Sequence, residues 1–458
     1  MPLPRLGELL VAATGLPRFR ATQLYDALYR QRLPSLDAVS TLSARDKATL
    51  AAAFSFDRGT VASDATSGDG TRKWLLKLPG DGAAVETVVI PAAFRAGGDS
   101  SRGGARATVC VSSQVGCSLA CAFCHTGTQR LMRNLTAADI VLQVLHAAAA
   151  TGAPVGTTTA AAAAAGAPPP LPQHRLSNIV FMGQGEPGYN WRAVSTAIAV
   201  LTDPHGLAFA PRKITVSTAG VAPIIPRVAT ETPGVRLAIS LHAATNDLRS
   251  RLMDINRHFP VEAVMEGAAA YLKARAAEVA ARRGGANSRA GGDDSDEESG
   301  SEDEGRPVAR VVDTRTPARP TSRSQTLRRV LAAAGADSHN SNARVRVTFE
   351  YVMLAGVNDG VTHADQLAAL LTSYLPSGAA HVNLIAFNPW PGSTFAPSSR
   401  AACLAFQDTL LAAGIRTHIR HSRGVDILGA CGQLRSAADP KVARTPAAAM
   451  RAGGGVIN

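Results

Sequence analysis

Several features are scarce or absent in this chain of 458 residues. It has six cysteines, which is sparse for the disulfide framework of a secreted domain, and no secretory signal is recognisable. It has no run of about 18 or more bulky apolar residues that could span a membrane, and no Ser- and Arg-rich transit peptide is evident. We therefore expect a protein of a reducing compartment without membrane contact: the cytoplasm or, for a eukaryotic chain, the plastid or mitochondrial matrix.

Apolar residues and positive charge are abundant. Hydrophobic residues make up 46% of the chain, as in a globular protein, and its length leaves room for about two or three domains and a large buried core. The formal net charge is +12, although an acidic stretch between residues 293 and 304 lowers it. This basic balance suggests a polyanionic partner.

The sequence divides into four predicted regions. Apolar residues at helical spacing predict a small helical domain over 1–60. Two β-rich runs around a Pro-Gly-Asp-Gly turn predict a short β-hairpin extension and linker over 61–107. A larger domain is expected over 108–435, and a small-residue, Gly-rich flexible tail over 436–458.

Two stretches of the larger domain are interpreted as insertions. Residues 147–175 form an Ala/Thr/Pro run without apolar periodicity, and residues 281–325 mix Gly, Ser, acidic and Arg-rich segments. Because neither stretch can bury enough apolar surface to offset its ordering entropy, both are predicted to be mobile surface loops. A regulatory role for the acidic loop is the alternative to a tolerated expansion.

Strand-like and helical runs alternate through the rest of the larger domain. Repeated βα units imply a parallel sheet, and their number favours an α/β fold with a partial (β/α) barrel of the TIM type. Thr136 and Asp139 resemble a capping box that begins the helix after the first strand. In such a barrel the chemistry lies at the C-terminal ends of the strands. The predicted strands are 108–112, 178–182, 213–217, 235–241, 345–353, 381–387 and 415–420.

Three cysteines lie within eight residues in the sequence Cys117-Ser-Leu-Ala-Cys121-Ala-Phe-Cys124. This spacing allows three thiolates to bind three irons of one cubane 4Fe–4S cluster, which leaves the fourth iron open for a substrate. A structural zinc site is the alternative, but it needs a fourth Cys or His at comparable spacing. His125 is adjacent and has no paired partner. The three cysteines are therefore predicted to hold an iron–sulfur cluster.

Small polar residues follow several of the predicted strands. Gly185 and Glu186 end one strand: glycine lets backbone carbonyls approach a ligand closely, and the carboxylate can hold an ammonium group. Each such segment alone could be an ordinary strand-to-helix turn. Together with the cysteine loop they predict a cofactor pocket. The other residues at such positions are Ser217, Ser240, Leu241, His242 and Asn388.

Two further cysteines bear on the chemistry. Cys110 lies seven residues before Cys117, and Cys431 follows a basic stretch that contains Arg420 and Arg423. A thiol near cationic groups is more nucleophilic at neutral pH. Taken alone, each is more readily interpreted as a buried structural thiol, which is how we interpret Cys403.

These segments together resemble the RlmN/Cfr family of RNA methyltransferases, and the spacing of the three cysteines resembles the radical S-adenosylmethionine (SAM) signature. The resemblance implies a radical SAM barrel with one 4Fe–4S cluster that methylates an adenine of large-subunit (23S-type) rRNA, or of rRNA and tRNA. The helical N-terminal domain resembles that of the RlmN branch, which methylates carbon 2, whereas the Cfr branch methylates carbon 8. The segments are Cys110-Val-Ser-Ser-Gln-Val-Gly-Cys117, the CxxxCxxC loop, Gly-Gln-Gly-Glu186-Pro, Ser240-Leu-His242-Ala and Ala-Cys431-Gly-Gln-Leu.

The resemblance also implies a reaction sequence with two SAM molecules per turnover. One SAM methylates Cys431, and a second, bound to the cluster, yields a 5′-deoxyadenosyl radical that abstracts hydrogen from this methyl group. The resulting carbon radical adds to adenine, whose electron-poor carbon 2 cannot attack a methyl sulfonium. Cys110 then resolves the protein–RNA crosslink by forming a disulfide with Cys431, and Glu86 accepts the proton of the attacked carbon.

SAM contacts are implied by the same matching, with three departures that remove no ligand. Gln184 replaces the family's usual Met, Ala219 replaces a common Ser, and His125-Thr-Gly replaces Ser-Thr-Ala. The implied SAM contacts are Gly185, Glu186, Ser217, Ser240, Leu241, His242 and Asn388.

The partners implied are rRNA, with tRNA as a further substrate, and an electron donor such as flavodoxin or ferredoxin; a monomer is expected. A non-catalytic iron–sulfur RNA-binding protein is the alternative of another class. Cys110, Cys431 and Glu86 argue against it, because none of them is needed merely to hold a cluster or RNA.

Overall fold

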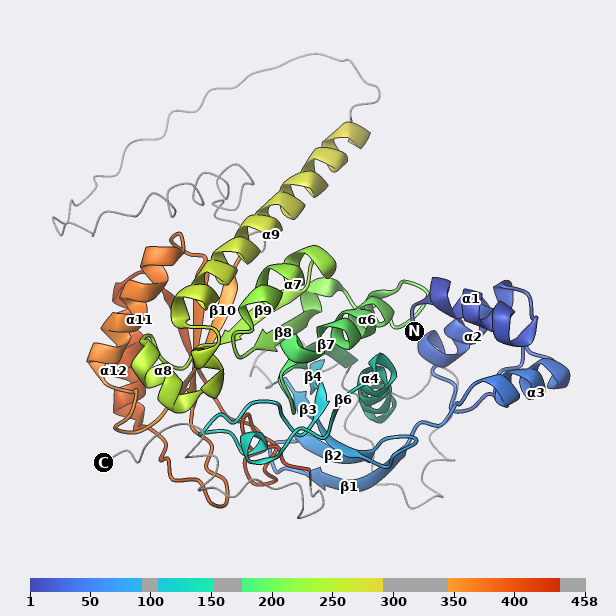
Figure 1. Ribbon diagram of the computed structural model, residues 1–458, viewed down its shortest axis with the longest axis horizontal. Coiled ribbons are helices and arrows are strands. Elements are labelled where there is room, and N and C mark those ends of the chain that lie inside the picture. The colour runs from blue at the N-terminus through green and yellow to red at the C-terminus, as the bar shows by residue number, and fades with distance from the viewer. Residues whose placement is uncertain (93–105, 152–174, 291–344, 437–458) are drawn as a thin grey trace, which may run out of the picture.

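The computed structural model describes residues 1–92, 106–151, 175–290 and 345–436 (Figure 1). In these residues one ten-stranded sheet has the order β1-β2-β3-β4-β7-β8-β9-β10-β11-β12. Neighbouring strands from β4 to β12 pair in parallel, which is the partial barrel that the alternation of strands and helices predicts. The parallel strands are β4 (Arg106–Cys110), β7 (Arg175–Phe181), β8 (Ile214–Thr218), β9 (Arg236–Ser240), β10 (Val347–Met353), β11 (Ala380–Ala386) and β12 (Arg416–Arg420).

Helices connect successive parallel strands and cover the outside of the curved sheet (Figure 1). The inner strands β8 to β11 are mostly buried and accordingly rich in Val, Ile and Leu, whereas the edge strand β12 is largely exposed. The long α9 packs on α7 and then extends away from the sheet. The connecting helices are α4 (Ala137–Thr151), α6 (Trp191–Thr202), α7 (Ile225–Glu231), α8 (Asn246–Leu252), α9 (Val261–Ala290), α11 (Val361–Tyr374) and α12 (Arg400–Ala412).

The antiparallel part of the sheet is larger than the predicted hairpin. A third strand, β1 (Thr60–Thr66), pairs with β2 (Arg72–Lys77), which pairs with β3 (Ala84–Pro91). Strand β3 then pairs antiparallel with β4, so these strands extend the barrel sheet. The sequence of β1 hides it, because the strand is exposed along nearly its whole length and has no apolar alternation.

The N-terminal helices have a small core of their own, to one side of the barrel (Figure 1). The unit contacts the barrel through Tyr25, which is buried in the main core, and through Arg32, which donates to the carbonyl of Ala148 at 3.2 Å. Its helices are α1 (Leu3–Thr14), α2 (Phe19–Tyr25), which continues into a π-helical turn (Asp26–Arg30), and α3 (Ala44–Ala53).

Parts of both predicted insertions are helical, so the prediction of surface loops is wrong for residues 147–151 and 281–290. Helix α4 continues to Thr151, because Ala147, Ala148 and Thr151 are buried against the core. Helix α9 continues to Ala290. The remainder of both insertions lies outside the described residues.

The start of the predicted tail is also wrong by one residue. Ser436 is buried, and its hydroxyl donates to Gln184 Oε1 at 2.9 Å. The rest of the tail lies outside the described residues, and none of the described helices is long and apolar enough to cross a membrane.

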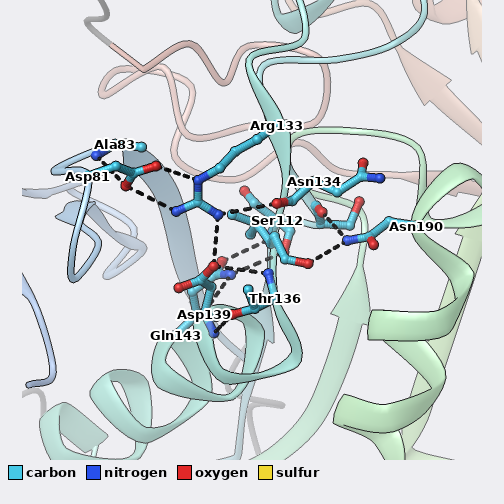
Figure 2. Close-up of polar contacts among 11 residues, drawn as sticks. Asp81, Ala83, Ser112, Arg133, Asn134, Thr136, Asp139, Gln143 and Asn190 are labelled. Carbon is cyan, nitrogen blue, oxygen red and sulfur yellow. Dashed lines mark hydrogen bonds and ion pairs between the residues drawn. The ribbon is translucent and has the colours of Figure 1, made fainter. Parts of the chain in front are cut away.

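Side chains fix both ends of the loop at 111–135, which joins β4 to α4 and contains the CxxxCxxC sequence (Figure 2). We call this segment the cysteine loop. The predicted capping box is confirmed at its end: Thr136 N donates to Asp139 Oδ2 at 2.9 Å, and Asp139 N donates to Thr136 Oγ1 at 3.1 Å. Arg133 donates to both Asp139 and Asp81, which ties the loop to the β2–β3 turn.

At the beginning of the cysteine loop, the side-chain amide of Gln143 bonds the N–H and the carbonyl of Ser112, as a neighbouring strand would. Its Oε1 accepts from Ser112 N at 2.8 Å and from Thr87 Oγ1 at 2.9 Å, and its Nε2 donates to Ser112 O at 3.0 Å. Gln143 is fully buried. These bonds satisfy backbone groups that have no water to bind.

We predict that Gln143→Leu destabilises the fold by roughly 3 kcal/mol, because it leaves three buried polar groups without a partner. Urea unfolding followed by circular dichroism measures this loss, with the exposed Gln31→Leu as the matched control, expected within about 0.5 kcal/mol of the parent. An unchanged midpoint for Gln143→Leu would contradict the assigned role.

Candidate active site

The C-terminal ends of the parallel strands open into a cavity of about 260 Å³. Most of the residues predicted for the site line it, as expected for a barrel of this kind. Leu241 and Glu86 do not line it. The predicted residues that do are Cys110, Cys117, Cys121, Cys124, Gly185, Glu186, Ser217, Ser240, His242, Asn388 and Cys431.

The three cysteines of the cysteine loop face this cavity and are each half-buried. Backbone amides support the thiols: Leu119 N donates to Cys117 Sγ at 3.4 Å, and N–H groups of Thr126 and Gly127 favour the thiolate of Cys124. Burial raises the pKa of Cys117 to about 12. A positively charged group in the cavity would offset that cost, because metal coordination deprotonates a thiol.

In the described residues, no three His, Cys, Asp or Glu side chains converge closely enough to hold a single metal ion. A cubane places each ligand on a different iron, so its ligands need not meet at one point. The three thiols of the cysteine loop, which all line the cavity, therefore fit a 4Fe–4S cluster.

The middle of the cysteine loop is held by the segment after β9. Ala120 N donates to the carboxylate of Asp254 at 3.2 Å, and Ala122 N donates to Leu252 O at 3.0 Å. The sequence offers no signal for Asp254, which lies more than a hundred residues from the loop.

Glu186 is buried, and both oxygens of its carboxylate accept hydrogen bonds from the protein. Thr218 Oγ1 and Gly188 N donate to its Oε1 at 2.7 and 2.8 Å, and Ala219 N donates to its Oε2 at 2.6 Å. Burial raises its pKa, and these hydrogen bonds lower it. It has no salt bridge within the described residues, so an ammonium group in the cavity would give this carboxylate a charged partner.

Ser217 and Ser240 end neighbouring strands, and their hydroxyl oxygens are 3.5 Å apart. Next to them, His242 has a φ of 60° and a ring that packs edge-on against Phe123 of the cysteine loop. Its Nδ1 accepts from Val352 N at 3.0 Å, which places the ring proton on Nε2. Burial, followed by the charge of Arg249, lowers the pKa of His242 to about 3, so the ring is neutral.

Arg249 is a functional candidate that the sequence interpretation missed. It is fully buried on α8 and donates to Ala219 O at 2.6 Å, Leu241 O at 3.1 Å and Asn256 Oδ1 at 2.9 Å. It therefore joins the ends of β8 and β9 beneath the cavity. Burial lowers the pKa of Arg249 to about 10, and the nearby Cys121 raises it. The side chain of Leu241 is buried in the core, and its backbone carbonyl accepts from Arg249.

Cys431 lies on the segment 421–436 that follows β12, which we call the C-terminal loop. Cys431 is exposed, whereas Cys110 on β4 is buried. Both residues line the cavity; burial raises the pKa of Cys110, and the charge of Cys431 raises it further. The pKa of the Cys431 thiol is raised, first by the protein atoms packed around its sulfur and then by the charge of Glu350. The charge of Arg420 lowers it.

The C-terminal loop is bonded directly to the cysteine loop. His125 N donates to Gly432 O at 2.7 Å, and Thr126 Oγ1 donates to Leu434 O at 2.6 Å. Asn388 Nδ2 donates to the carbonyl of Cys431 at 3.2 Å. The loop that contains Cys431 and the loop that contains Cys117, Cys121 and Cys124 are thus held against each other.

Gln184 and His125, which differ from the residues usual at these positions in the RlmN/Cfr family, both make polar contacts. Gln184 is buried; its Oε1 accepts from Glu86 N at 3.0 Å, and its Nε2 donates to Gln129 Oε1 at 3.1 Å. His125 stacks on Trp390 with ring centroids 4.7 Å apart, and its Nδ1 lies 3.2 Å from Gln433 O.

Glu86 lies on β3, and its carboxylate contacts Lys73 and the backbone of Arg435. Its pKa is raised by burial and lowered by Lys73. Val88, two residues along the same strand, pairs with Cys110, so Glu86 and Cys110 share one face of the sheet.

Curated proteins of known name resemble this chain over nearly its whole length. A protein from Beijerinckia indica named dual-specificity RNA methyltransferase RlmN is 37% identical over 448 residues, covering 96% of this chain and 92% of that protein. Proteins of the same name from Gluconobacter oxydans and Xanthobacter autotrophicus are 37% and 38% identical, and each covers 93% of this chain. No protein-family model matches.

A solved structure agrees with these relatives. A radical SAM methyltransferase from Sphaerobacter thermophilus is 34% identical and superposes with a TM-score of 0.68, covering 95% of this chain and 98% of that one. The fold and family predicted from the sequence are therefore confirmed: the chain belongs to the RlmN family of radical SAM RNA methyltransferases.

Proposed function

We propose that this protein methylates carbon 2 of an adenine in large-subunit rRNA, and also in tRNA. The observation that carries the proposal is the meeting of five cysteines at one cavity: three on the cysteine loop, Cys110 on β4 and Cys431 on the C-terminal loop. A cluster-binding protein without this chemistry has no use for the last two. The name dual-specificity of the relatives supports both RNA substrates.

The family implies a 4Fe–4S cluster and SAM, and this chain has groups that suit both. Cys117, Cys121 and Cys124 would hold the cluster, and Glu186 would receive the amino group of SAM. When bound, the cluster and SAM supply the electron, the radical and the methyl group. We expect two SAM molecules per turnover, reduction by a flavodoxin or ferredoxin, and a monomer in a reducing compartment.

The remaining SAM contacts follow from what lines the cavity. The hydroxyls of Ser217 and Ser240 and the Nε2–H of His242 are donors for polar groups of SAM, and Asn388 and Gly185 border the same space. Leu241 would act through its backbone, because its side chain is buried away from the cavity.

The two remaining cysteines divide the sulfur chemistry between them. Cys431 is exposed, so its sulfur can accept a methyl group and later bond to the adenine through that carbon. Cys110 is buried at the end of β4, where its sulfur is kept from solvent. Its sulfur would then bond to that of Cys431, and the bond between the Cys431 sulfur and the carbon attached to adenine would break. Glu86, on the same sheet face, is the proposed acceptor of the proton on carbon 2.

Basic residues near Cys431 suit an RNA ligand. Arg420, His421 and Arg423 line the cavity, and guanidinium groups bind phosphates without reading sequence. A target adenine has to leave its base stack to enter the cavity that Cys431 and Cys110 line, as in other enzymes that modify bases.

The proposed function is tested by nucleoside mass spectrometry of an rRNA fragment and a tRNA, each incubated anaerobically with reconstituted protein, SAM and a reductant. The expected product is 2-methyladenosine in both. A product of 8-methyladenosine would instead assign the carbon-8 chemistry of the Cfr branch. Cleavage of SAM without any methylated adenosine on either RNA would refute the proposed substrates.

Cys431→Ala is expected to abolish methylated product and to leave the iron and sulfide content unchanged, because Cys431 is not a proposed cluster ligand. The matched control is Cys403→Ala, since Cys403 is buried on α12 outside the cavity. Loss of the cluster in Cys431→Ala would mean that Cys431 is a ligand rather than the methyl carrier.

Cys110→Ala is expected to stop the reaction one stage later and to trap a covalent protein–RNA adduct. Denaturing gel electrophoresis detects the adduct as a band that disappears on ribonuclease treatment. The double variant with Cys431→Ala should form none. Free methylated RNA from Cys110→Ala at the parent rate would rule out the resolving role.

A further inference from the structure

The C-terminal loop has no regular secondary structure between β12 and Ser436, so other parts of the molecule must fix the position of Cys431. Its beginning is bonded to the β1–β2 turn: Asp426 accepts from Ser67 Oγ at 2.6 Å, and Gly424 N donates to Asp69 Oδ2 at 3.0 Å. Segments that are hundreds of residues apart in sequence therefore set the geometry of the thiol.

Closer to Cys431, the loop contacts a buried ion pair on the antiparallel strands. Lys73 Nζ of β2 lies 2.8 Å from Glu86 Oε1 of β3. The side chains are 15% and 6% exposed, so the pair is nearly dry. Leu75 lies opposite Glu86, which makes Lys73 its diagonal neighbour on the same face of the sheet.

Each member of this pair also binds the backbone of the C-terminal loop. Lys73 Nζ donates to Leu428 O at 3.1 Å, three residues before Cys431. Glu86 Oε2 accepts from Arg435 N at 2.6 Å, four residues after Cys431. The ion pair thus holds the loop on both sides of the cysteine.

Apolar packing fixes the loop between these two points. Leu434 packs with Val88 and Cys110 in a small buried cluster. Val88 lies opposite Cys110 in the sheet, so the face that contains Lys73 and Glu86 also contains Cys110. The two polar contacts and this cluster together hold the C-terminal loop over Cys110.

Both carboxylate oxygens of Glu86 are engaged, one by Lys73 and one by Arg435 N, and neither Glu86 nor Lys73 lines the cavity. Hydrogen bonds to charged groups stabilise a structure more than those between neutral groups. Removing one partner of a buried pair also leaves the other charge uncompensated, which is strongly destabilising locally.

We propose that Lys73 and Glu86 are positioning residues that clamp the C-terminal loop and thereby place Cys431 for methylation and for its encounter with Cys110. This role rests on the proposed function of Cys431. It is additional to proton transfer from adenine, which concerns Glu86 alone and a later stage of the reaction.

The loop itself is tested first, without SAM or RNA. Hydrogen–deuterium exchange of peptides spanning residues 424–436 is compared between the parent and Lys73→Met in the reconstituted full chain. Exchange should rise by about tenfold or more in this segment, because a charge-assisted hydrogen bond and its partner are lost. The control is Lys77→Met on the same strand, whose side chain is exposed and which should exchange like the parent.

Conservative variants keep the test valid if Lys73→Met folds poorly. Lys73→Arg retains a cation and should restore most of the protection of the loop. Glu86→Gln retains an oxygen that can accept from Arg435 N but loses the ion pair, so its exchange should fall between that of the parent and that of Lys73→Met. Parent-like exchange in both Lys73→Met and Glu86→Gln would overturn the clamp.

The second readout is the first half-reaction, the SAM-dependent methylation of Cys431, measured by mass spectrometry of the intact peptide. The clamp predicts a rate about tenfold or more lower in Lys73→Met and a smaller loss in Glu86→Gln. A purely proton-accepting Glu86 predicts normal methylation of Cys431 in both variants and loss of only the RNA product. If the parent does not methylate Cys431, the proposed function fails, while the exchange data still decide whether the clamp exists.

Discussion

The loop that brings three thiols to the interior of the barrel has little regular structure, so other segments must bond most of its backbone, and this constraint organises the structure. The amide of Gln143 bonds both backbone groups of Ser112. In the middle of the loop, Asp254 receives the N–H of Ala120. The end of the loop is fixed by the capping box and by Arg133 (Figure 2). Without these contacts, the buried loop would leave costly unsatisfied donors and acceptors.

The same constraint extends to the C-terminal loop and to the strand ends. The C-terminal loop obtains its partners from the cysteine loop and from the antiparallel strands β2 and β3, so the placement of Cys431 depends on segments far from it in sequence. Below the cavity, the buried Arg249 bonds carbonyls at the ends of β8 and β9 and provides a positive charge beside Cys121. Burial works against both of these charges, and hydrogen bonds support them: backbone carbonyls accept from Arg249, and Thr218 and backbone N–H groups donate to Glu186.

The sequence predicts the local features well. The cysteine spacing, the alternation of strands and helices and the capping box at Thr136 each depend on neighbouring residues, and the fold and family they indicate are confirmed. It does not reveal β1, because an exposed edge strand carries no hydrophobic alternation. It also misses Arg249, Asp254 and Lys73, whose roles come from contacts between distant segments. The individual roles of Cys431, Cys110 and Glu86 stay predictions.

The central claim is that three cysteines hold a cubane with one open iron at a cavity shared with Cys431. Iron and sulfide analysis with Mössbauer spectroscopy of anaerobically reconstituted protein, with and without SAM, tests it most directly. The account predicts about four irons and four sulfides per chain and a change at a single iron when SAM is added. A mononuclear metal without sulfide, or a cluster in which no iron responds to SAM, would contradict it.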